Sequence, residues 1–238
     1  DTISVLEDTD GDLVMDAKRV FADKLDLVTS FVFHQDGVIA LAAPDILFLR
    51  DKDGDGACDV REVLYTGFGF GDTHAVMSNA RWGFDGWIYA TQGYSGNGST
   101  NVRSGEGRGG RIFGRIGNGL FRFKPDGSAI EIVSSYGSNT WGLDFAPDGE
   151  LFFTMANGAH LRHVVTPEKA LARSRLPGTE SWTDLPDHDR VFPLVVRHEE
   201  AYRQIDFVGG FTATSGCMVY DGGAWPADHH RGDDTGAD

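Results

Sequence analysis

The sequence predicts an all-β protein, a β-propeller, from three observations. An aromatic residue three positions before Asp-Gly, followed by alternating apolar residues, recurs at 33–42, 82–91 and 145–154. An Asp-rich loop that begins at Asp8 recurs 43 residues later at Asp51. The 32 glycines suit many tight turns. Units of about 40–50 residues with about four short strands each are typical of propeller blades, which stack because one sheet cannot bury both of its faces alone.

The first part of the chain predicts a series of hairpins. Residues 1–20 place two apolar runs on either side of the first Asp-rich loop, which indicates one hairpin. Residues 31–41 predict strand, Asp-Gly turn and strand, since Gly tolerates the positive φ that tight turns need. Residues 46–49 and 63–65 predict the two strands that flank the second Asp-rich loop.

The second part repeats this plan with two insertions. Residues 87–91 are aromatic and β-branched, as strands prefer, and residues 121–133 predict an added outer hairpin. The insertion over 93–119 is rich in Gly, Ser and Arg. Its stretch from Arg103 to Arg115 could fold over the mouth of the ring, and a flexible surface loop is the alternative. The insertion over 161–203 begins with a short helix expected from Pro167.

The predicted propeller domain spans residues 1–227 and is followed by a polar tail over 228–238. A last repeat begins within 207–220. The chain therefore supplies about four blades, two of them incomplete, of a propeller that we expect to have six or seven, since closed propellers have about four to eight. Its opening in the middle of a repeat suggests a processed or partial chain.

The composition excludes some functions. The net charge of −15 argues against a nucleic-acid partner, because phosphate binding needs clustered Lys and Arg. No apolar run approaches the roughly 20 residues that cross a bilayer. The only cysteines, Cys58 and Cys217, are compatible with one disulfide or with two small buried thiols, and we favour the thiols.

The two Asp-rich loops predict calcium sites, because calcium prefers six to eight hard oxygen ligands. The second loop has the spacing of a calcium loop, with oxygen ligands at positions one, three, five, nine and twelve and Gly56 at six. The first loop has Leu13 at that glycine position and Arg19 at position twelve. The predicted ligands are Asp51, Asp53, Asp55, Asp59, Glu62, Asp8, Asp10, Asp12 and Asp16. A solvated acidic turn between two strands is the alternative.

His74 is the candidate general base. It lies two residues after Asp72 on the connection that enters the strand-forming unit, where loops usually carry function. A histidine can accept a proton near neutral pH when a carboxylate orients it. A structural or surface histidine is the alternative. Asp228-His229-His230 is a further candidate site, for a transition metal.

A set of motifs resembles a known family. They are Thr66-Gly67-Phe68-Gly69, Asp72-Thr73-His74, Arg81-Trp82-Gly83, Thr91-Gln92-Gly93-Tyr94, Asn139-Thr140-Trp141-Gly142 and Phe211-Thr212-Ala213. Together they resemble the propeller of planctomycete membrane-bound dehydrogenases, which is distantly similar to the soluble quinoprotein glucose and sorbosone dehydrogenases. The resemblance covers about residues 1–230. It implies an oxidoreductase that uses pyrroloquinoline quinone.

The resemblance also implies roles for single residues. His74 matches the base that takes the substrate hydroxyl proton, and Asn139 matches an asparagine beside the quinone. Asn157 falls where the sugar dehydrogenases place a turn near the cofactor metal. Ser138 stands where they carry an arginine that pairs with the quinone carboxylates. The cationic partner would then be Arg81, or an arginine of the first insertion: Arg103, Arg108, Arg111 or Arg115.

Two functions remain open. The first is an exported, periplasmic or extracellular oxidoreductase that acts on a sugar-like alcohol or aldehyde, with Arg81 and Asn139 as positioning groups. A c-type cytochrome on another domain or chain would accept its electrons, and another part of the protein would associate with the membrane. The second is a non-catalytic, calcium-binding propeller that binds a protein or glycan. The fold alone cannot choose, because propellers host both kinds of function.

Overall fold

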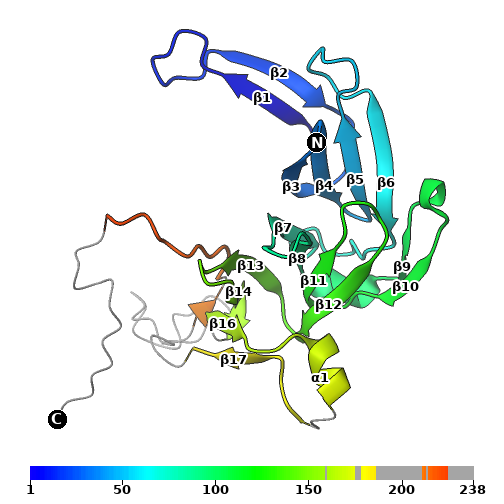
Figure 1. Ribbon diagram of the computed structural model, residues 1–238, viewed down its shortest axis with the longest axis vertical. Coiled ribbons are helices and arrows are strands. Elements are labelled where there is room, and N and C mark those ends of the chain that lie inside the picture. Colours follow the sequence, from blue (N-terminus) through cyan, green and yellow to red (C-terminus); the bar gives the residue numbers. More distant parts are fainter. Residues whose placement is uncertain (159, 175–177, 186–210, 213, 225–238) are drawn as a thin grey trace, which may run out of the picture.

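The computed structural model describes residues 1–158, 160–174, 178–185, 211–212 and 214–224, with only the backbone at 157–158 and 211–212. The chain is all-β, as predicted, and its sheets are antiparallel. They follow one another along an arc from the hairpin β1–β2 to the strand β17 (Figure 1). This is a propeller-like arrangement, and the number of blades in a full ring stays a prediction.

Three successive sheets form what we call the first, second and third blades. The first blade contains β3 (Val28–His34), β4 (Gly37–Ala42), β5 (Asp45–Arg50) and β6 (Val60–Thr66). The second contains β7 (Met77–Trp82), β8 (Ile88–Gln92), β11 (Gly119–Phe123) and β12 (Ile130–Ser135). The third contains β13 (Thr140–Phe145), β14 (Leu151–Met155), β16 (Leu161–Val164) and β17 (Trp182–Asp184). The residues of 121–133 thus supply outer strands, as predicted.

The hairpin of β1 (Ile3–Glu7) and β2 (Ala17–Ala22) is equivalent to the outer half of the first blade. Ile3 pairs with Ala22 as Ile46 pairs with Tyr65, and the rest of the register also agrees after a shift of 43 residues. Both pairs carry an irregularity after the isoleucine. The 43-residue spacing of the Asp-rich loops therefore reflects equivalent strands.

Alternating side chains join the blades. Ile39 and Leu41 of β4 lie in a core shared with the second blade, whereas Val38 and Ala40 lie in a core with β1 and β2. Successive side chains of a strand point to opposite faces, so one strand serves both cores. Phe153 of β14 belongs to a third core, between the second and third blades.

A threonine at the same place in two repeats ties neighbouring blades together. Thr91 Oγ1 donates to the Trp141 carbonyl oxygen in the next blade, at 2.9 Å. Thr154, 63 residues later and at the equivalent position of its repeat, donates to the carbonyl oxygen of Ser215. The segment around Ser215 therefore lies against β13 and β14 as β13 lies against the second blade, in keeping with the repeat predicted over 207–220.

Residues 103–115 neither cover the ring mouth nor form a loose surface loop, because they extend the first blade. β9 (Asn101–Ser104) pairs with β6, and β10 (Ile112–Arg115) pairs with β9, so the insertion extends the first blade to six strands. The backbone groups at the outer edge of β6 hydrogen-bond to this hairpin. Short 3₁₀ turns at Tyr94–Gly98 and Glu106–Arg108 complete the insertion.

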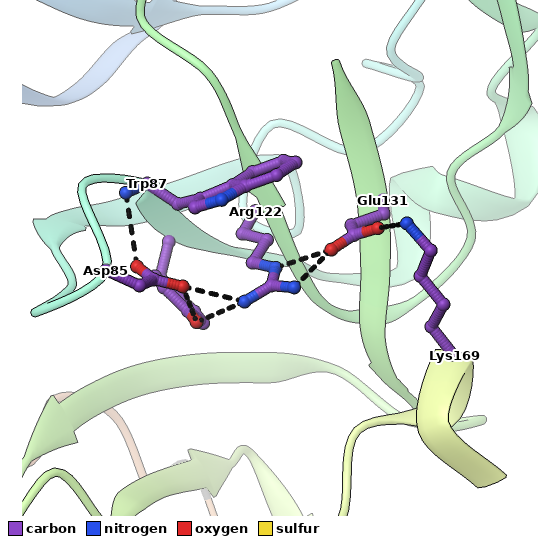
Figure 2. Close-up of polar contacts among 6 residues, drawn as sticks. Asp85, Trp87, Arg122, Glu131 and Lys169 are labelled. Carbon is purple, nitrogen blue, oxygen red and sulfur yellow. Dashed lines mark hydrogen bonds and ion pairs between the residues drawn. The ribbon is translucent and has the colours of Figure 1, made fainter.

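The predicted start of the second insertion at residue 161 is wrong, because β16 and β17 complete the third blade, but α1 (Glu168–Ser174) confirms the predicted short helix between them. A cluster of charges holds it to the second blade (Figure 2). Arg122 Nε donates to Glu131 Oε1 at 2.7 Å, and Lys169 of α1 donates to the other oxygen of Glu131. Arg122 Nη1 also donates to Asp85 Oδ2 at 2.7 Å, and its guanidinium lies 4.7 Å from the centre of the Trp87 ring. The cluster connects β11, β12, the turn between β7 and β8, and the helix.

The remaining pair of strands is short: β15 (Asn157–Gly158) pairs with β18 (Phe211–Thr212). Both cysteines are free thiols, as favoured, and each is partly buried. Among the described residues, no helix has the length and apolarity that crossing a membrane requires.

Candidate functional site

Loops from two blades meet beside His74. The Ser95 backbone N–H donates to the carbonyl oxygen of Ala75 at 2.9 Å, and Ser95 Oγ accepts the Asp72 N–H at 2.9 Å. Gly93 touches a third loop: a Cβ there would lie 2.2 Å from Asn139 Oδ1 and 2.8 Å from the Ala75 oxygen. Only glycine fits so close an approach. The Thr-Gln-Gly-Tyr and Asn-Thr-Trp-Gly motifs therefore converge at the loop that carries His74.

His74 stands at the rim of this convergence and is open to solvent. Its side chain is 91% exposed, and Nδ1 lies 3.5 Å from Asp72 Oδ1. The same carboxylate oxygen accepts the His74 backbone N–H at 2.9 Å, which fixes the carboxylate next to the ring. The pair leaves Nε2 free to meet a solute. The imidazole lines none of the pockets described below, so it is a rim residue and not part of an enclosed cavity.

Behind the rim lie buried oxygen atoms that no described residue satisfies. They are Gln92 Oε1, Asn139 Oδ1 and Thr140 Oγ1, and each of these residues is more than nine-tenths buried. A buried acceptor without a donor costs about 1–3 kcal/mol, so such atoms normally meet water or a ligand. We call these three oxygen atoms the acceptor cluster; each is sealed from solvent in the structure.

The structure does not bring Arg81 to this site. Strand β7 pairs Met77 with Gln92 at one end and Arg81 with Tyr89 near the other, which places Arg81 about 13 Å along the strand from the loop end. Arg81 Nη1 instead pairs with Asp144 Oδ1 at 3.2 Å. Arg81 and Asn139 thus do not form one positioning pair, because they lie toward opposite ends of the inner strands.

The arginines of the first insertion are also committed elsewhere. Arg108 Nε lies 3.0 Å from Glu62 Oε1, Arg111 Nη1 donates to the Ser128 carbonyl oxygen at 3.4 Å, and Arg115 donates to backbone oxygens in 96–97. Arg103 lies in β9 at the outer edge of the first blade. A trianionic quinone needs cationic donors, and Ser138 supplies none. Among the residues that the structure describes, those around His74 and Asn139 therefore do not fit pyrroloquinoline quinone.

The second Asp-rich loop presents a set of carboxylates suited to a hard cation. Asp51, Asp53 and Asp59 each offer an oxygen, and these oxygens lie within 4.8 Å of one another. Calcium binds oxygens at about 2.3–2.6 Å, so two ligands on opposite sides of the ion are about 5 Å apart. The loop is pre-shaped by Asp51, whose two oxygens accept the backbone N–H groups of Gly54 (2.7 Å) and Gly56 (2.8 Å).

The first Asp-rich loop has the same construction. Asp8, Asp10 and Asp16 also place one oxygen each within 4.8 Å of one another. Asp8 accepts the N–H groups of Gly11 (2.7 Å) and Leu13 (2.8 Å), and these hydrogen bonds hold the pKa of the Asp8 carboxyl below its usual value. Leu13 has φ 71°, close to the 85° of Gly56. The loop thus keeps its shape although a leucine replaces the glycine.

Three predicted ligands are not part of these two groups. Glu62 lies in β6, not in a helix, and its carboxylate pairs with Arg108. Asp12 accepts the Val14 N–H at 2.8 Å, and Asp55 accepts the Ala57 N–H at 2.8 Å. The position-twelve ligand is missing because a strand turns that side chain toward the insertion hairpin, whereas a helix would turn it back toward the loop.

A family model matches residues 1–232 as a domain of unknown function, DUF7133. The chain belongs to the DUF7133 family. No curated protein and no solved structure matches it. Membership in DUF7133 assigns no activity.

The remaining predicted residues of the DUF7133 chain are only partly described. The backbone of Asn157 lies in β15, and its side chain lies outside the described residues. The candidate at Asp228-His229-His230 also lies outside them. The sequence interpretation missed Gln92 and Thr140, although both occur in the motifs that carry the resemblance. Both residues lie where a predicted strand meets a loop, and functional residues are frequent at such places, so this position could have identified them.

Proposed function

We propose that this domain binds a hydroxyl-bearing, sugar-like substrate at the loop face and takes part in its oxidation. The observation that carries the proposal is the His74–Asp72 pair on a loop that packs against the acceptor cluster. The resemblance to quinoprotein-like dehydrogenases supports the same role for His74. A neutral imidazole with a carboxylate at Nδ1 is suited to accept a proton near pH 7.

The chain's own residues would perform the acid–base part of the reaction. His74 Nε2 would accept the proton of the substrate hydroxyl, and Asp72 would stabilise the imidazolium that forms. Gln92 and Asn139 would accept hydrogen bonds from neighbouring hydroxyls and so orient the substrate. The hydrogen on the carbinol carbon would leave as a hydride to a two-electron organic acceptor, which leaves a carbonyl compound, and a c-type cytochrome would then reoxidise that acceptor in two one-electron steps.

The described part of the chain offers no suitable cationic partner for pyrroloquinoline quinone, the cofactor implied by the resemblance. Calcium fits better. We propose that Asp51, Asp53 and Asp59, and Asp8, Asp10 and Asp16, hold structural calcium in the outer loops. A cation would offset the mutual repulsion of these carboxylates.

An exported, periplasmic or extracellular location suits this proposal. Extracellular calcium-binding modules work with Kd values of about 10⁻⁴–10⁻³ M, which sites with few ligands can reach. A c-type cytochrome on another domain or chain is the electron acceptor that we propose. Association with the membrane would come from another part of the protein.

Dye reduction by the full chain tests the proposal. We expect sugar-dependent reduction of an artificial electron acceptor in calcium buffer, with and without added quinone, across a panel of aldoses and polyols. His74→Gln should abolish turnover while leaving the melting temperature unchanged, since the side chain is 91% exposed. His163→Gln is the matched control, because that histidine pairs with Glu150 on the outer strands of the third blade. Equal activity of wild type and His74→Gln would refute the role.

A second function is favoured by a specific observation: the arginines that could neutralise a cofactor are paired elsewhere, and Ser138 replaces the expected one. A non-catalytic, calcium-dependent propeller that binds a glycan or protein at the same face would need no such cation. Sugar binding by calorimetry without turnover in any acceptor, and loss of that binding in Asn139→Ala, would establish this alternative.

A further inference from the structure

One face of the first blade is only half covered. On its outer half, the hairpin β1–β2 packs against Val38, Ala40 and Leu49. On its inner half, Phe31 is 42% exposed and Phe33 is 78% exposed, and the two rings pack against each other at 5.9 Å. Two neighbouring exposed aromatic rings on an inner strand are unusual for a free surface.

On the opposite face of β3, the second blade covers the side chains that alternate with Phe31 and Phe33. Ser30 Oγ accepts the Ala80 N–H at 2.9 Å, and the His34 ring lies 5.6 Å from the Trp82 ring. Both partners belong to β7, the inner strand of the second blade. Phe31 and Phe33 point away from β7, into a trough of about 530 Å³ between β3 and the hairpin β1–β2.

The trough follows the open edge of β1. In the described part of the chain, β1 pairs with β2 alone, which leaves its other backbone edge without a neighbouring strand. The equivalent edge of β5 pairs with β4 over six residue pairs. Leu6, on the open edge, is 57% exposed and lines the trough together with Phe31 and Phe33.

We infer that the trough seats an inner hairpin, equivalent to β3–β4, from a further repeat of the same polypeptide. Its second strand would pair with β1 as β4 pairs with β5, and its first strand would cover Phe31 and Phe33 as β3 covers Ala80 and Trp82. The register supports this occupant, because all five residue pairs of β1–β2 match those of β5–β6 after the shift of 43. The hairpin would carry the repeat's aromatic residue, Asp-Gly turn and alternating apolar residues.

Residues 28–43 of the chain itself provide the hairpin with which this inference can be tested. The 43-residue shift aligns Asp1 with Pro44, so a copy of residues 28–43 joined directly before Asp1 reproduces the β4–β5 connection. We expect the added hairpin to slow hydrogen exchange by about tenfold or more at those amides of Ile3–Glu7 that point away from β2, since they would enter a ladder. The matched control is the same extension with proline at the position of Ile39, which cannot continue the ladder.

Phe31→Ser provides an independent readout. In the unextended chain this change should leave the melting temperature nearly unchanged, whereas in the extended chain it should lower it, because the ring is then buried. Equal exchange at β1 in the extended chain and its proline control would overturn the inference. So would a dimer of the unextended chain that disappears in Val5→Pro, since a second copy would then occupy the edge.

Discussion

Replacing Leu13 by glycine should stabilise the protein, although it removes a hydrophobic side chain. Leu13 occupies the left-handed region at φ 71° and is 89% exposed, so its side chain contributes little burial. The equivalent residue of the second loop, Gly56, has φ 85°. The hydrogen bond from the Leu13 N–H to Asp8 holds the leucine in this conformation.

The expected magnitude follows from two opposing terms. A non-glycine residue in the left-handed region costs roughly 1–2 kcal/mol, and glycine loses about 0.5–1 kcal/mol more conformational free energy on folding than alanine does. The difference is a gain of about 0.5–1 kcal/mol for Leu13→Gly. In a chain of this size, a gain of 1 kcal/mol raises the melting temperature by about 2–4 °C.

Urea unfolding followed by tryptophan fluorescence measures this difference in calcium-free buffer. The reverse change, Gly54→Ala, is the matched control: Gly54 has φ 81° with open space around a Cβ, so it should lose stability through backbone strain alone. Leu13→Gly should also raise the calcium affinity of the first loop. The assignment of backbone strain would be refuted if Leu13→Gly left the free energy of unfolding unchanged or lowered it, and Gly54→Ala left it unchanged as well.

Three further predictions concern the blades and their loops. Arg122→Met should cost about 2–4 kcal/mol in urea unfolding, because it leaves Asp85 and Glu131 without their partly buried partner; Arg61→Met, which removes an exposed pair, should cost less than about 1 kcal/mol. Burial raises the pKa of the Glu131 carboxyl, but hydrogen bonds from Lys169 and Arg122 outweigh it, and the net pKa is lowered from 4.5. The ionised Glu131 carboxylate therefore stabilises the folded state above about pH 4.5, and this stabilisation is lost as the pH falls through the pKa that Glu131 has in the folded state. If the stability of Glu131→Gln depended on acid pH in the same way as that of wild type, this prediction would be contradicted. Finally, chelation of calcium should lower the melting temperature of wild type, and Asp51→Asn should reduce that difference; an unchanged melting temperature on chelation would rule out structural calcium.

Much of the fold could be predicted because the repeats are marked by turn chemistry. The Asp-Gly turns at 36–37, 85–86 and 148–149 each join two strands of one blade, as expected. Threonine at the end of the second strand is part of the same signal, and Thr91 and Thr154 show its role between blades. Such contacts join residues 50 or more positions apart, so their partners could not be identified from local patterns.

The candidate site was less predictable. His74 and Asn139 lie on loops that converge, but Arg81 is four residues along a strand from the loop end, and strand direction decided its position. Glu62 fitted the calcium spacing, yet the β conformation of β6 turned it toward Arg108. The insertion over 93–119 could not be placed by composition, because its route depends on the free edge of β6.

The six-stranded first blade has a mechanical consequence. The connection that leaves β8 crosses to the neighbouring sheet, forms β9 and β10 there, and returns to β11. The backbone connection within the second blade therefore contributes two strands to the edge of the first blade. A pulling force that opened the gap between these two sheets would first have to break the β6–β9 ladder. Between the second and third blades, the connection from β16 to β17 crosses as the helix α1, which contacts β12 through side chains and not through a strand ladder.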